Sequence, residues 1–542
     1  MPFDLIIIGA GINGAGIARD AASRGLRVAL VEKEDIGSGT SSWSGRLIHG
    51  GLRYLEQYDV RLVRESLRER EHLFRLAPHL VKPVPLIMPF YGHNQRPPWM
   101  IRTGMLAYDA LSWDKTTTRH RILSREETLE RFPGMDREDL HGAAVYMDGQ
   151  VVWSERLCVE TVLAAHYDGA VIRTHAAVDG LLLQNGRVHG VRYTDTLTGE
   201  RYELHGRLVI NAAGPWVDAV LRETGSGSSE QLIGGTKGSH LIVDPFPGAP
   251  SDVVYYESQE DGRLILVAPW GQRYLIGTTD IRIDGDPGEV RADEEEMDYL
   301  LSQTNLLIPG ANLTPDDVLF TYSGVRPLPY VPERAEGSVP RSHVIHDHAP
   351  EIRGLLSIIG GKLTTYRNLG EDAVDKVFAL FGRKPPRCVT RYLPLPGAKV
   401  ADLSNFREEL AKASGLPQPT VDRLVEVYGS RATEVWKIGY GSPELLEPFD
   451  EDMGAIGAEL VFAFKEEFAR TLTDALMRRT MVGLGADSGL GSVEHAAQIL
   501  ARHLDWAPDR VEEEIEAYRR YVRRFAVPGR EEAISSTQEA GA

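Results

Sequence analysis

The chain has 542 residues, of which 42% are hydrophobic and 25% charged, a composition typical of a folded protein with two to four domains. Its formal net charge of −18 argues against a nucleic-acid partner, so a site for an anionic small molecule would need locally gathered cations. No apolar run is long enough for a membrane-spanning helix, and the N-terminus does not have the pattern of a signal peptide. The two cysteines, Cys158 and Cys388, form no CxxC pair, and we predict no metal site.

A dinucleotide-binding motif opens the chain. Leu5–Ile8 is predicted to be a buried strand, and Gly9-Ala10-Gly11-Ile12-Asn13-Gly14 follows it as G-x-G-x-x-G. A helix over residues 16–23 and a second strand over 27–31 come next, and Glu32 ends that strand. Gly9 permits the tight turn, Gly11 lets the backbone approach a pyrophosphate, and Gly14 lets the helix pack on the strand. Glu32 can accept hydrogen bonds from a ribose, so the whole unit predicts dinucleotide binding.

Three later segments favour FAD over NAD. Thr40, Ser41, Ser42 and Ser44 are a hydroxyl-rich stretch that could contact pyrophosphate and flavin, although a simple capped loop would have the same composition. Residues 208–210 form an apolar strand that leads into Asn211-Ala212-Ala213-Gly214-Pro215-Trp216, a second close approach of backbone to cofactor. Leu355–Ile359 is another strand, and residues 360–366 open a helix that runs to 378, with its positive N-terminus suited to a reduced flavin.

The rest of the chain predicts two further kinds of structure. An amphipathic helix is expected over 55–77, and short strands over 171–210 with turns at Asn185-Gly186 and Thr198-Gly199. Strands over 240–243, 263–268 and 274–278 indicate an antiparallel substrate domain. Beyond a proline-rich linker at 383–398 the pattern is helical, with Val511, Ile515, Tyr518 and Val522 at helical spacing. Residues 92–111 mix basic, aromatic and aliphatic side chains, which fits either a membrane-surface element or an ordinary buried helix.

The predicted fold class is α/β, with a Rossmann-like FAD-binding domain, an interleaved antiparallel-sheet substrate domain and a C-terminal all-α cap domain. The FAD-binding domain is assigned to residues 1–80, 140–230 and 340–382, and the substrate domain to 81–139 and 231–339. The cap domain is assigned to 383–525, and residues 526–542 are predicted to be a disordered tail.

Taken together, the motifs resemble the FAD-dependent glycerol-3-phosphate dehydrogenases, within the D-amino-acid-oxidase-like flavoproteins. The resembling segments are residues 9–16, 40–55, 211–216, 237–240, 277–280, 322–327, 360–367 and, in the cap domain, 474–480. In one departure, Gly45-Arg46 stands where the family usually has Ser-Lys. The contact that this serine side chain would make with the cofactor is therefore in doubt.

The resemblance implies oxidation of sn-glycerol 3-phosphate to dihydroxyacetone phosphate, with hydride transfer to FAD and electrons passed to a membrane quinone. It also implies a cytoplasmic enzyme held peripherally on the inner face of the cytoplasmic membrane, and a homodimer. Arg53, Arg326 and Lys362 lie on three separate glycine-bearing loops and are predicted to bind the phosphate, with Tyr54 as a further donor. His49 and His240 are equal candidates for the base, and Lys237 is expected only to shape its loop.

The residues predicted to contact FAD are Gly9, Gly11, Asn13, Gly14, Glu32, Thr40, Ser41, Ser42, Ser44, Leu47, His49, Gly50, Val178, Ala213, Gly214, Trp216, Gly361, Lys362, Leu363 and Thr364.

Three alternatives to the quinone-linked enzyme stay open. A glycerol-3-phosphate oxidase that uses oxygen and makes peroxide would have a similar active site. An FAD-dependent amine or amino-acid oxidase would also want arginine, for an α-carboxylate. A non-enzymatic flavin-holding module would not need cations on three loops.

Overall fold

The apolar N-terminal strand forms the middle of a parallel sheet in the computed structural model of the chain, which describes residues 1–56, 59–224, 230–331 and 341–530. β1 (Leu5–Ile8) and β19 (Leu355–Ile359) have the predicted bounds, and β2 (Val28–Val31) begins one residue late. All side chains of these strands are buried, as expected of a sheet covered on both faces. The described strands run in the order β18-β19-β11-β1-β2-β7, and only β18 is antiparallel to its neighbour. The remaining strands are β7 (Val171–Arg173), β11 (Val209–Asn211) and β18 (Val344–Asp347).

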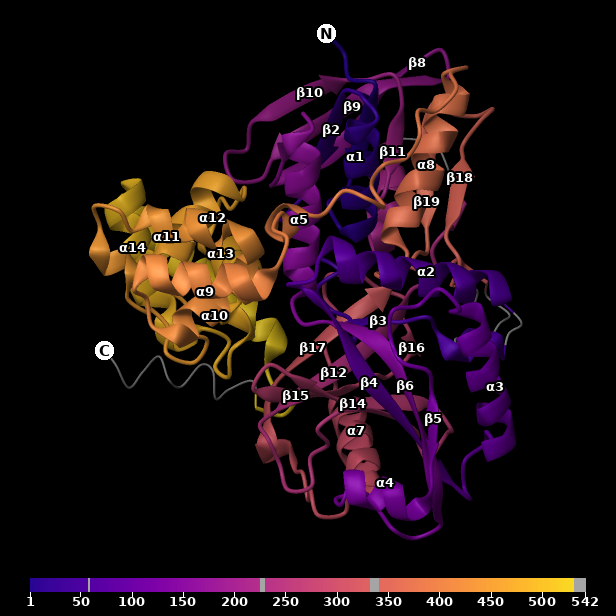
Figure 1. Cartoon of the computed structure of the whole chain (residues 1–542). Helices are drawn as coiled ribbons and strands as arrows, with labels where there is room; N and C mark the ends of the chain where they lie inside the picture. Colours follow the sequence, from indigo (N-terminus) through magenta and orange to yellow (C-terminus); the bar gives the residue numbers. More distant parts are fainter. Residues whose placement is uncertain (57–58, 225–229, 332–340, 531–542) are drawn as a thin grey trace.

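Helices and a small second sheet cover this nucleotide-binding sheet (Figure 1). α1 (Ile12–Ser23) packs against both α5 (Ser154–Tyr167) and α8 (Tyr366–Leu380). α1 starts earlier than predicted because Gly11 is already its N-cap, and α8 starts later, which leaves residues 360–365 as a loop. The small antiparallel sheet has the two predicted turns, with Asn185, Gly186 and Gly199 at positive φ. Its strands are β8 (Ala176–Gln184), β9 (Arg187–Asp195) and β10 (Arg201–His205), and α6 (Val217–Glu223) follows β11.

A large sheet, with ten strands among the described residues, forms the predicted substrate domain and lies below the nucleotide-binding sheet in Figure 1. It is antiparallel except where β13 pairs with β4. β4 and β6 pair along their whole length, from Val81 opposite Val151 to Tyr91 opposite Leu140, and β3 also pairs with β6. Residues 140–151, which the sequence assigned to the FAD-binding domain, thus pair within the large sheet. Its strands are β3 (Leu47–Ile48), β4 (Val81–Tyr91), β5 (Arg121–Leu123), β6 (Leu140–Val151), β12 (Thr236–Val243), β13 (Val253–Glu257), β14 (Leu264–Trp270), β15 (Arg273–Gly277), β16 (Ile281–Arg282) and β17 (Val318–Arg326).

The helix predicted over 55–77 is shorter than expected. A 3₁₀ turn spans Leu52–Leu55, and α2 (Val60–Leu76) begins where the Asp59 side chain accepts the Leu62 N–H. An acidic N-cap supplies the missing partner at this end of the helix, which explains the later start. α3 (Pro98–Leu111), α4 (Arg125–Arg131) and α7 (Glu294–Leu307) are the other helices of the substrate domain.

The C-terminal part is helical, as predicted, and lies beside α5 in Figure 1. Its helices are α9 (Leu403–Ser414), α10 (Gln418–Tyr428), α11 (Ala432–Ile438), α12 (Gly457–Glu466), α13 (Leu472–Arg478), α14 (Val493–Leu504) and α15 (Pro508–Val522). The predicted tail begins too early, because Val527 is buried in the substrate-domain core and the Ala526 carbonyl accepts the Thr321 hydroxyl. Residues 531–542 lie outside the described part. No described helix is long and apolar enough to cross a membrane.

Candidate functional site

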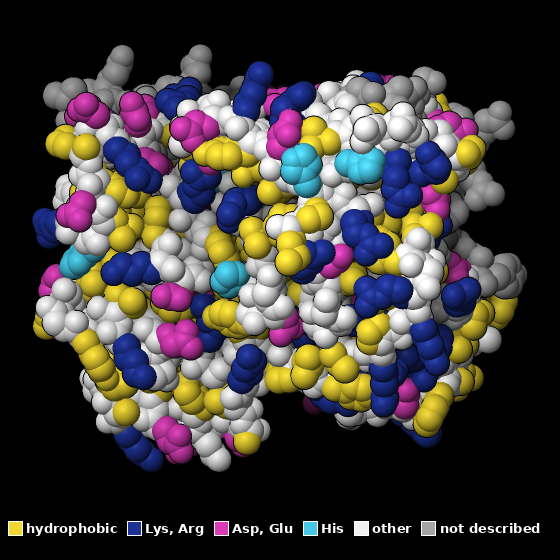
Figure 2. Space-filling view, turned by 90° about the horizontal axis from the view of Figure 1, so that it is seen from above, with side chains coloured by type: hydrophobic (Ala, Val, Ile, Leu, Met, Phe, Trp, Pro, Cys, Tyr) yellow, Lys and Arg dark blue, Asp and Glu magenta, His cyan; other side chains and the backbone are white. Residues whose placement is uncertain are grey.

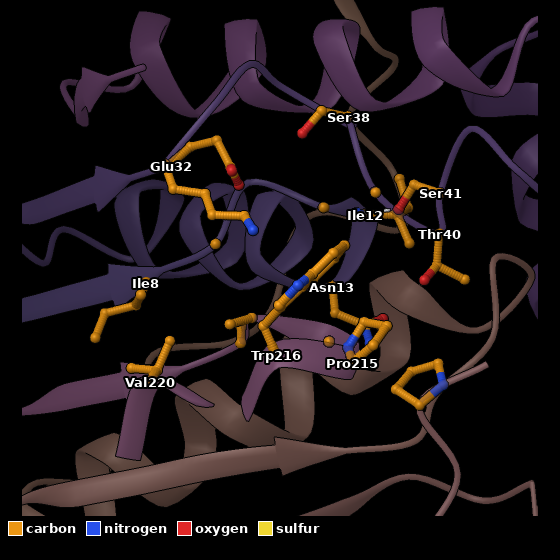
Figure 3. A pocket seen from close by; sticks show the side chains of 18 of the residues that line it. Ile8, Ile12, Asn13, Glu32, Ser38, Thr40, Ser41, Pro215, Trp216 and Val220 are labelled. Carbon is orange, nitrogen blue, oxygen red and sulfur yellow. Dashed lines mark hydrogen bonds between the residues drawn. The ribbon is translucent and has the colours of Figure 1, made fainter. Parts of the chain in front are cut away.

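A pocket of about 300 Å³, open to solvent at its mouth, lies where four strands of the nucleotide-binding sheet end (Figure 3). β1, β2, β11 and β19 each lead directly into residues that line it, and a βαβ sheet binds its ligand at this edge. Of the predicted cofactor residues, those that line the pocket are Gly9, Gly11, Asn13, Glu32, Thr40, Ser41, Ser44, Val178, Ala213, Gly214, Trp216, Gly361, Lys362 and Leu363. Sequence reasoning missed some lining residues: Lys33, Ser38 and Ala176 lie in none of the motifs, and Pro215 and Pro327 lie within motifs but were not predicted as contacts.

The glycine turn places the N-terminus of α1 at this pocket. Gly9 has φ of 101°, and a Cβ there would lie 2.7 Å from the Ala212 carbonyl oxygen. A Cβ on Gly14 would lie 1.9 Å from the Gly9 carbonyl oxygen, so Gly14 packs the helix on the turn without lining the pocket. The Ile12 N–H donates to Ser41 Oγ at 2.9 Å. The turn therefore provides the close backbone approach and positive helix end that a pyrophosphate needs.

One end of the pocket combines an acid, a cation and an aromatic ring. Glu32 is 9% exposed and its carboxylate accepts the N–H groups of Ala10 and Glu34, at 2.7 and 3.1 Å. Burial raises the pKa of this carboxyl. The Lys33 ammonium lies 4.1 Å from the Trp216 ring centroid, and Figure 3 shows the Trp216 ring within the pocket. These groups can contact the ribose and base of a nucleotide.

The opposite side carries Asn13 and the loop after β19. Asn13 Nδ2 donates to the Gly360 carbonyl at 3.1 Å, and its Oδ1 is buried without a hydrogen-bond partner in the described part of the chain. A Cβ on Gly361 would lie 2.7 Å from Asn13 Nδ2. A buried Asn13 oxygen without a hydrogen-bond partner, next to a glycine that leaves room for a ligand, fits a dinucleotide that extends along the pocket.

Five predicted cofactor residues do not line the pocket, besides Gly14. The Ser42 hydroxyl is buried and donates to the Gly37 carbonyl at 2.6 Å. Leu47 pairs with Gln150 in the substrate sheet, and the Gly50 N–H donates to Tyr108 and Asp148. Thr364 Oγ1 accepts the His49 N–H at 3.2 Å. These residues build the walls around the pocket, so their predicted contacts with the cofactor stay predictions.

Cations gather where the β19 loop meets the substrate sheet. Lys362 lines the pocket, donates to Ser66 Oγ at 2.9 Å and lies 4.5 Å from the Tyr54 ring centroid. Arg326, with its side chain 23% exposed, donates to Asp280 Oδ1 and Thr278 Oγ1, both at 3.0 Å. Arg341, 15% exposed, lies 3.6 Å from the other oxygen of Asp280.

Arg341 has no motif around it and was missed from the sequence. Burial is the main cause that lowers the pKa of Lys362 and of Arg326, and the charge of Arg341 lowers both further. The charge of Arg341 is therefore felt at both Lys362 and Arg326. Arg53 lies in the 3₁₀ turn of Leu52–Leu55, and its side chain is outside the described residues. The Lys237 ammonium is held by Glu296 at 2.7 Å and Asp293 at 3.0 Å.

The two candidate bases are both neutral at pH 7. Burial, with the charges of Lys362 and Arg70, lowers the pKa of His49 to about 3. His240 is 2% exposed and stacks on Tyr322 with ring centroids 4.7 Å apart. Burial, with the charges of Arg326 and Arg46, lowers its pKa to about 3 as well. Either imidazole can therefore accept a proton, and the geometry leaves both candidates open.

Arg46, at the family departure, is a structural residue. Its guanidinium donates to both oxygens of Glu155, at 2.8 and 2.9 Å, and lies 4.5 Å from the Trp270 ring centroid. Both partners are buried, and Arg46 does not line the pocket. The arginine therefore holds the loop before β3 against α5.

Comparisons with known proteins agree with this geometry. Residues 4–367 match a family model described as FAD dependent oxidoreductase, and residues 388–511 match the C-terminal domain of alpha-glycerophosphate oxidase. The chain is 44% identical over 537 residues to a glycerol-3-phosphate dehydrogenase of Synechocystis, with 97% of each chain covered. It is 34% identical over 491 residues to an aerobic glycerol-3-phosphate dehydrogenase of Staphylococcus haemolyticus, with 88% of this chain and 86% of the relative covered. The structure of glycerol-3-phosphate dehydrogenase from Bacillus halodurans complexed with FAD is 29% identical, with a TM-score of 0.78 over 97% of this chain and 95% of that one.

Proposed function

The chain belongs to the FAD-dependent glycerol-3-phosphate dehydrogenase family, and on that premise we propose that it oxidises sn-glycerol 3-phosphate to dihydroxyacetone phosphate and passes the electrons to a membrane quinone. Bound FAD supplies the hydride-accepting chemistry, and the protein supplies binding, orientation and proton transfer. The loops after β1, β2, β11 and β19 hold the cofactor in the pocket described above.

The observation that carries the proposal is that the charge of Arg341 acts on Lys362, which lines the pocket, while Arg341 and Arg326 share the carboxylate of Asp280. A phosphate dianion is best bound by several charged donors, and an arginine can contact two of its oxygens. Because the chain as a whole is acidic, cations that gather here mark the place where a small anion binds. Lys362 belongs to both sites, so it would place the substrate carbon next to the flavin.

Loss of the C2 hydrogen as hydride requires that the C2 hydroxyl give up its proton. His49 or His240 takes this proton as a neutral imidazole, and the nearby cations stabilise the developing negative charge on oxygen. The charge of Lys362 acts on His49, and that of Arg326 acts on His240, which is 2% exposed. Replacing each with glutamine, and comparing flavin reduction at saturating substrate, tests which of the two is the base.

An anaerobic experiment tests the function itself. Flavin-loaded protein is mixed with sn-glycerol 3-phosphate, and flavin absorbance is followed, with glycerol as a matched control that lacks the phosphate. We expect prompt bleaching with the phosphate ester and none with glycerol. Flavin-loaded protein that stays oxidised with sn-glycerol 3-phosphate would show that the proposal is wrong.

The electron acceptor is tested with the same protein. A quinone-linked enzyme should reoxidise quickly with a soluble quinone and release little peroxide in air. Peroxide release at the full rate of substrate oxidation, without quinone, would favour the oxygen-using oxidase instead. Turnover of an amino acid but not of sn-glycerol 3-phosphate would favour the amine or amino-acid oxidase.

Contact with the membrane surface is proposed to occur through α3. Ile101, Met105 and Tyr108 face the protein interior, as the buried-helix interpretation expected. The opposite face of α3 carries Trp99 and Leu106, which are 69 and 64% exposed and lie seven residues apart, and Trp113, which is 78% exposed, lies in the turn after the helix. This spacing places Trp99 and Leu106 on one helical stripe, and the exposed Trp113 follows the C-terminal end of the helix. On the face seen from above in Figure 2, lysine and arginine side chains gather toward the right-hand side.

Vesicle flotation measures this contact. The triple variant Trp99→Ser, Leu106→Ser, Trp113→Ser should lose binding to anionic phospholipid vesicles, because apolar and aromatic surface drives interfacial binding. Tyr392→Ser and Tyr440→Ser, at exposed aromatic positions of 58 and 62%, are the matched controls. Equal vesicle binding by the triple variant and the parent protein would exclude α3 as the contact.

We also propose that the protein is a homodimer, and light scattering after size-exclusion chromatography measures its mass.

A further inference from the structure

One short helix of the C-terminal domain contacts two separate walls of the cofactor pocket. α13 (Leu472–Arg478) and the adjoining Arg479 reach the loop of residues 33–41 after β2. The same helix reaches the turn between β7 and β8, at residues 174–175. We propose that the C-terminal domain is part of the FAD-binding apparatus, with Asp35, His175, Asp474, Arg478 and Arg479 as positioning residues that hold these two walls in register.

The first wall is held through Asp35. Its carboxylate is fully buried and accepts three hydrogen bonds from the C-terminal domain. Arg478 Nε donates at 2.6 Å, and Arg479 Nη1 and Nη2 donate at 2.9 and 2.7 Å. Asp35 is three residues before Ser38, whose N–H donates to the Asp35 carbonyl at 3.1 Å. Since Ser38, Gly39, Thr40 and Ser41 all line the pocket, the position of Asp35 determines where this wall begins.

The second wall is held through His175. Its Nε2 lies 2.9 Å from Asp474 Oδ2, and the residue has φ of 53°, so the turn depends on a specific contact. Ala176, Ala177 and Val178, which follow directly, line the pocket. Asp474 is itself fixed, because the N–H groups of Arg470 and Thr471 donate to Oδ2 at 2.9 and 3.0 Å, and Arg478 Nη2 lies 3.2 Å from Oδ1.

The two walls are also bonded to each other at the end of β2. The His175 N–H donates to the Glu34 carbonyl, and the Ala176 N–H donates to the Glu32 carbonyl, both at 2.7 Å. Glu32 is the predicted ribose ligand, so the network that starts in α13 ends at a residue that contacts the cofactor. Side chains of α13 thus hold the acid, the hydroxyl-rich loop and the β7–β8 turn in one arrangement before the cofactor arrives. A site ordered in advance binds more tightly, because less freedom is lost on binding.

A second interdomain ion pair provides a control. Arg156, on α5, donates to both oxygens of Glu467 at 2.5 and 2.8 Å, and both side chains are fully buried. This pair joins the same two domains as the pair of Asp35 and Arg479, yet neither partner lines the pocket. If these ion pairs only keep the domains together, losing either pair should weaken FAD binding equally. If the pair of Asp35 and Arg479 positions the pocket walls, only its loss should weaken FAD binding.

Titration of the full-length apoprotein with FAD, followed by quenching of flavin fluorescence, tests the inference. We expect Asp35→Asn and Arg479→Gln to weaken FAD binding at least tenfold, and Arg156→Gln to change it less than twofold. The increase in melting temperature on adding FAD should shrink in the first two variants only. Equal dissociation constants for Arg479→Gln, Arg156→Gln and the parent would overturn the inference, as would equal weakening by both arginine substitutions.

If Arg479→Gln does not fold, Arg479→Lys is used instead. It keeps the charge but cannot donate to both oxygens of Asp35, and it should weaken FAD binding by a smaller factor than Asp35→Asn. An unchanged affinity in both Asp35→Asn and Arg479→Lys would also overturn it. The inference rests on the proposed placement of FAD in this pocket, which Gly11→Val tests separately by blocking the backbone approach. The titration contains no substrate, so its FAD affinities can be interpreted even if the proposed reaction with sn-glycerol 3-phosphate is not observed.

Discussion

His240 should make the stability of the protein depend on pH in a way that one substitution can isolate. The imidazole is 2% exposed, and neither ring nitrogen has a hydrogen-bond partner among the described residues. Burial, with the charges of Arg326 and Arg46, lowers its pKa from 6.5 to about 3. Between these two values the unfolded chain binds a proton at this position and the folded chain does not. Protonation therefore favours unfolding, and stability falls as the pH is lowered.

The size of the effect follows from the two pKa values. At pH 7.5 the imidazole is neutral in both states, and its contribution to the pH dependence is close to zero. At pH 5 the imidazole of the unfolded chain is protonated and the folded one is not, which costs about 2 kcal/mol of stability. His240→Gln removes the titrating group, so the stability difference between parent and variant should shift by about 2 kcal/mol between the two pH values. Every other titrating group is shared, and its effect cancels in this difference.

Urea unfolding of the FAD-saturated proteins at pH 7.5 and 5.0, followed by tryptophan fluorescence, gives the four free energies needed. Any constant cost of placing glutamine in the site appears at both pH values and does not affect the comparison. A shift of less than about half a kcal/mol would mean that the imidazole titrates alike in both states, and would refute the argument from burial.

Three further predictions address the cofactor, the substrate and the core. Gly9→Ala should yield protein without flavin, because the added Cβ would lie 2.7 Å from the Ala212 carbonyl oxygen. Gly25→Ala, where an added Cβ would meet nothing within 4 Å, should retain flavin. Absorbance spectra of the two purified proteins measure the flavin content. Arg326→Ala should weaken sn-glycerol 3-phosphate binding by about 2–5 kcal/mol at most, measured by anaerobic titration, and an unchanged affinity would remove Arg326 from the phosphate site. Arg46→Met should cost about 3–5 kcal/mol of stability in chemical denaturation, because Glu155 would be left as an unpaired buried charge; a smaller loss in Arg46→Lys would show that the charge matters most.

The nucleotide-binding unit could be predicted from the sequence because its signals are local. Strand, glycine turn, helix and terminal acid follow one another within 32 residues, and each is visible as a spacing of residue types. β1 and β19 therefore appear at their predicted bounds. Boundaries that depend on caps or distant partners were predicted less well. α2 begins at Val60 because of Asp59, and β6 belongs to the substrate sheet because of its pairing with β4.

Residues 92–111 show a different limit of prediction from sequence. Their mixed composition fitted both a buried helix and a surface element, and α3 has one face of each kind. Composition can identify an amphipathic helix, but whether its apolar side chains meet the core or the solvent depends on which elements pack against it.

The family and its dinucleotide motif follow from the sequence by itself, since both depend on residue types at fixed spacing along the chain. Only the tertiary structure showed that the charge of Arg341 acts on Arg326 and Lys362, that burial lowers the pKa of both candidate histidines, and that Arg479 bonds to Asp35. Each of these facts depends on burial and on charges brought together from distant parts of the chain. Coulomb and desolvation energies are set by distance in space and by access to water, neither of which spacing along the sequence records.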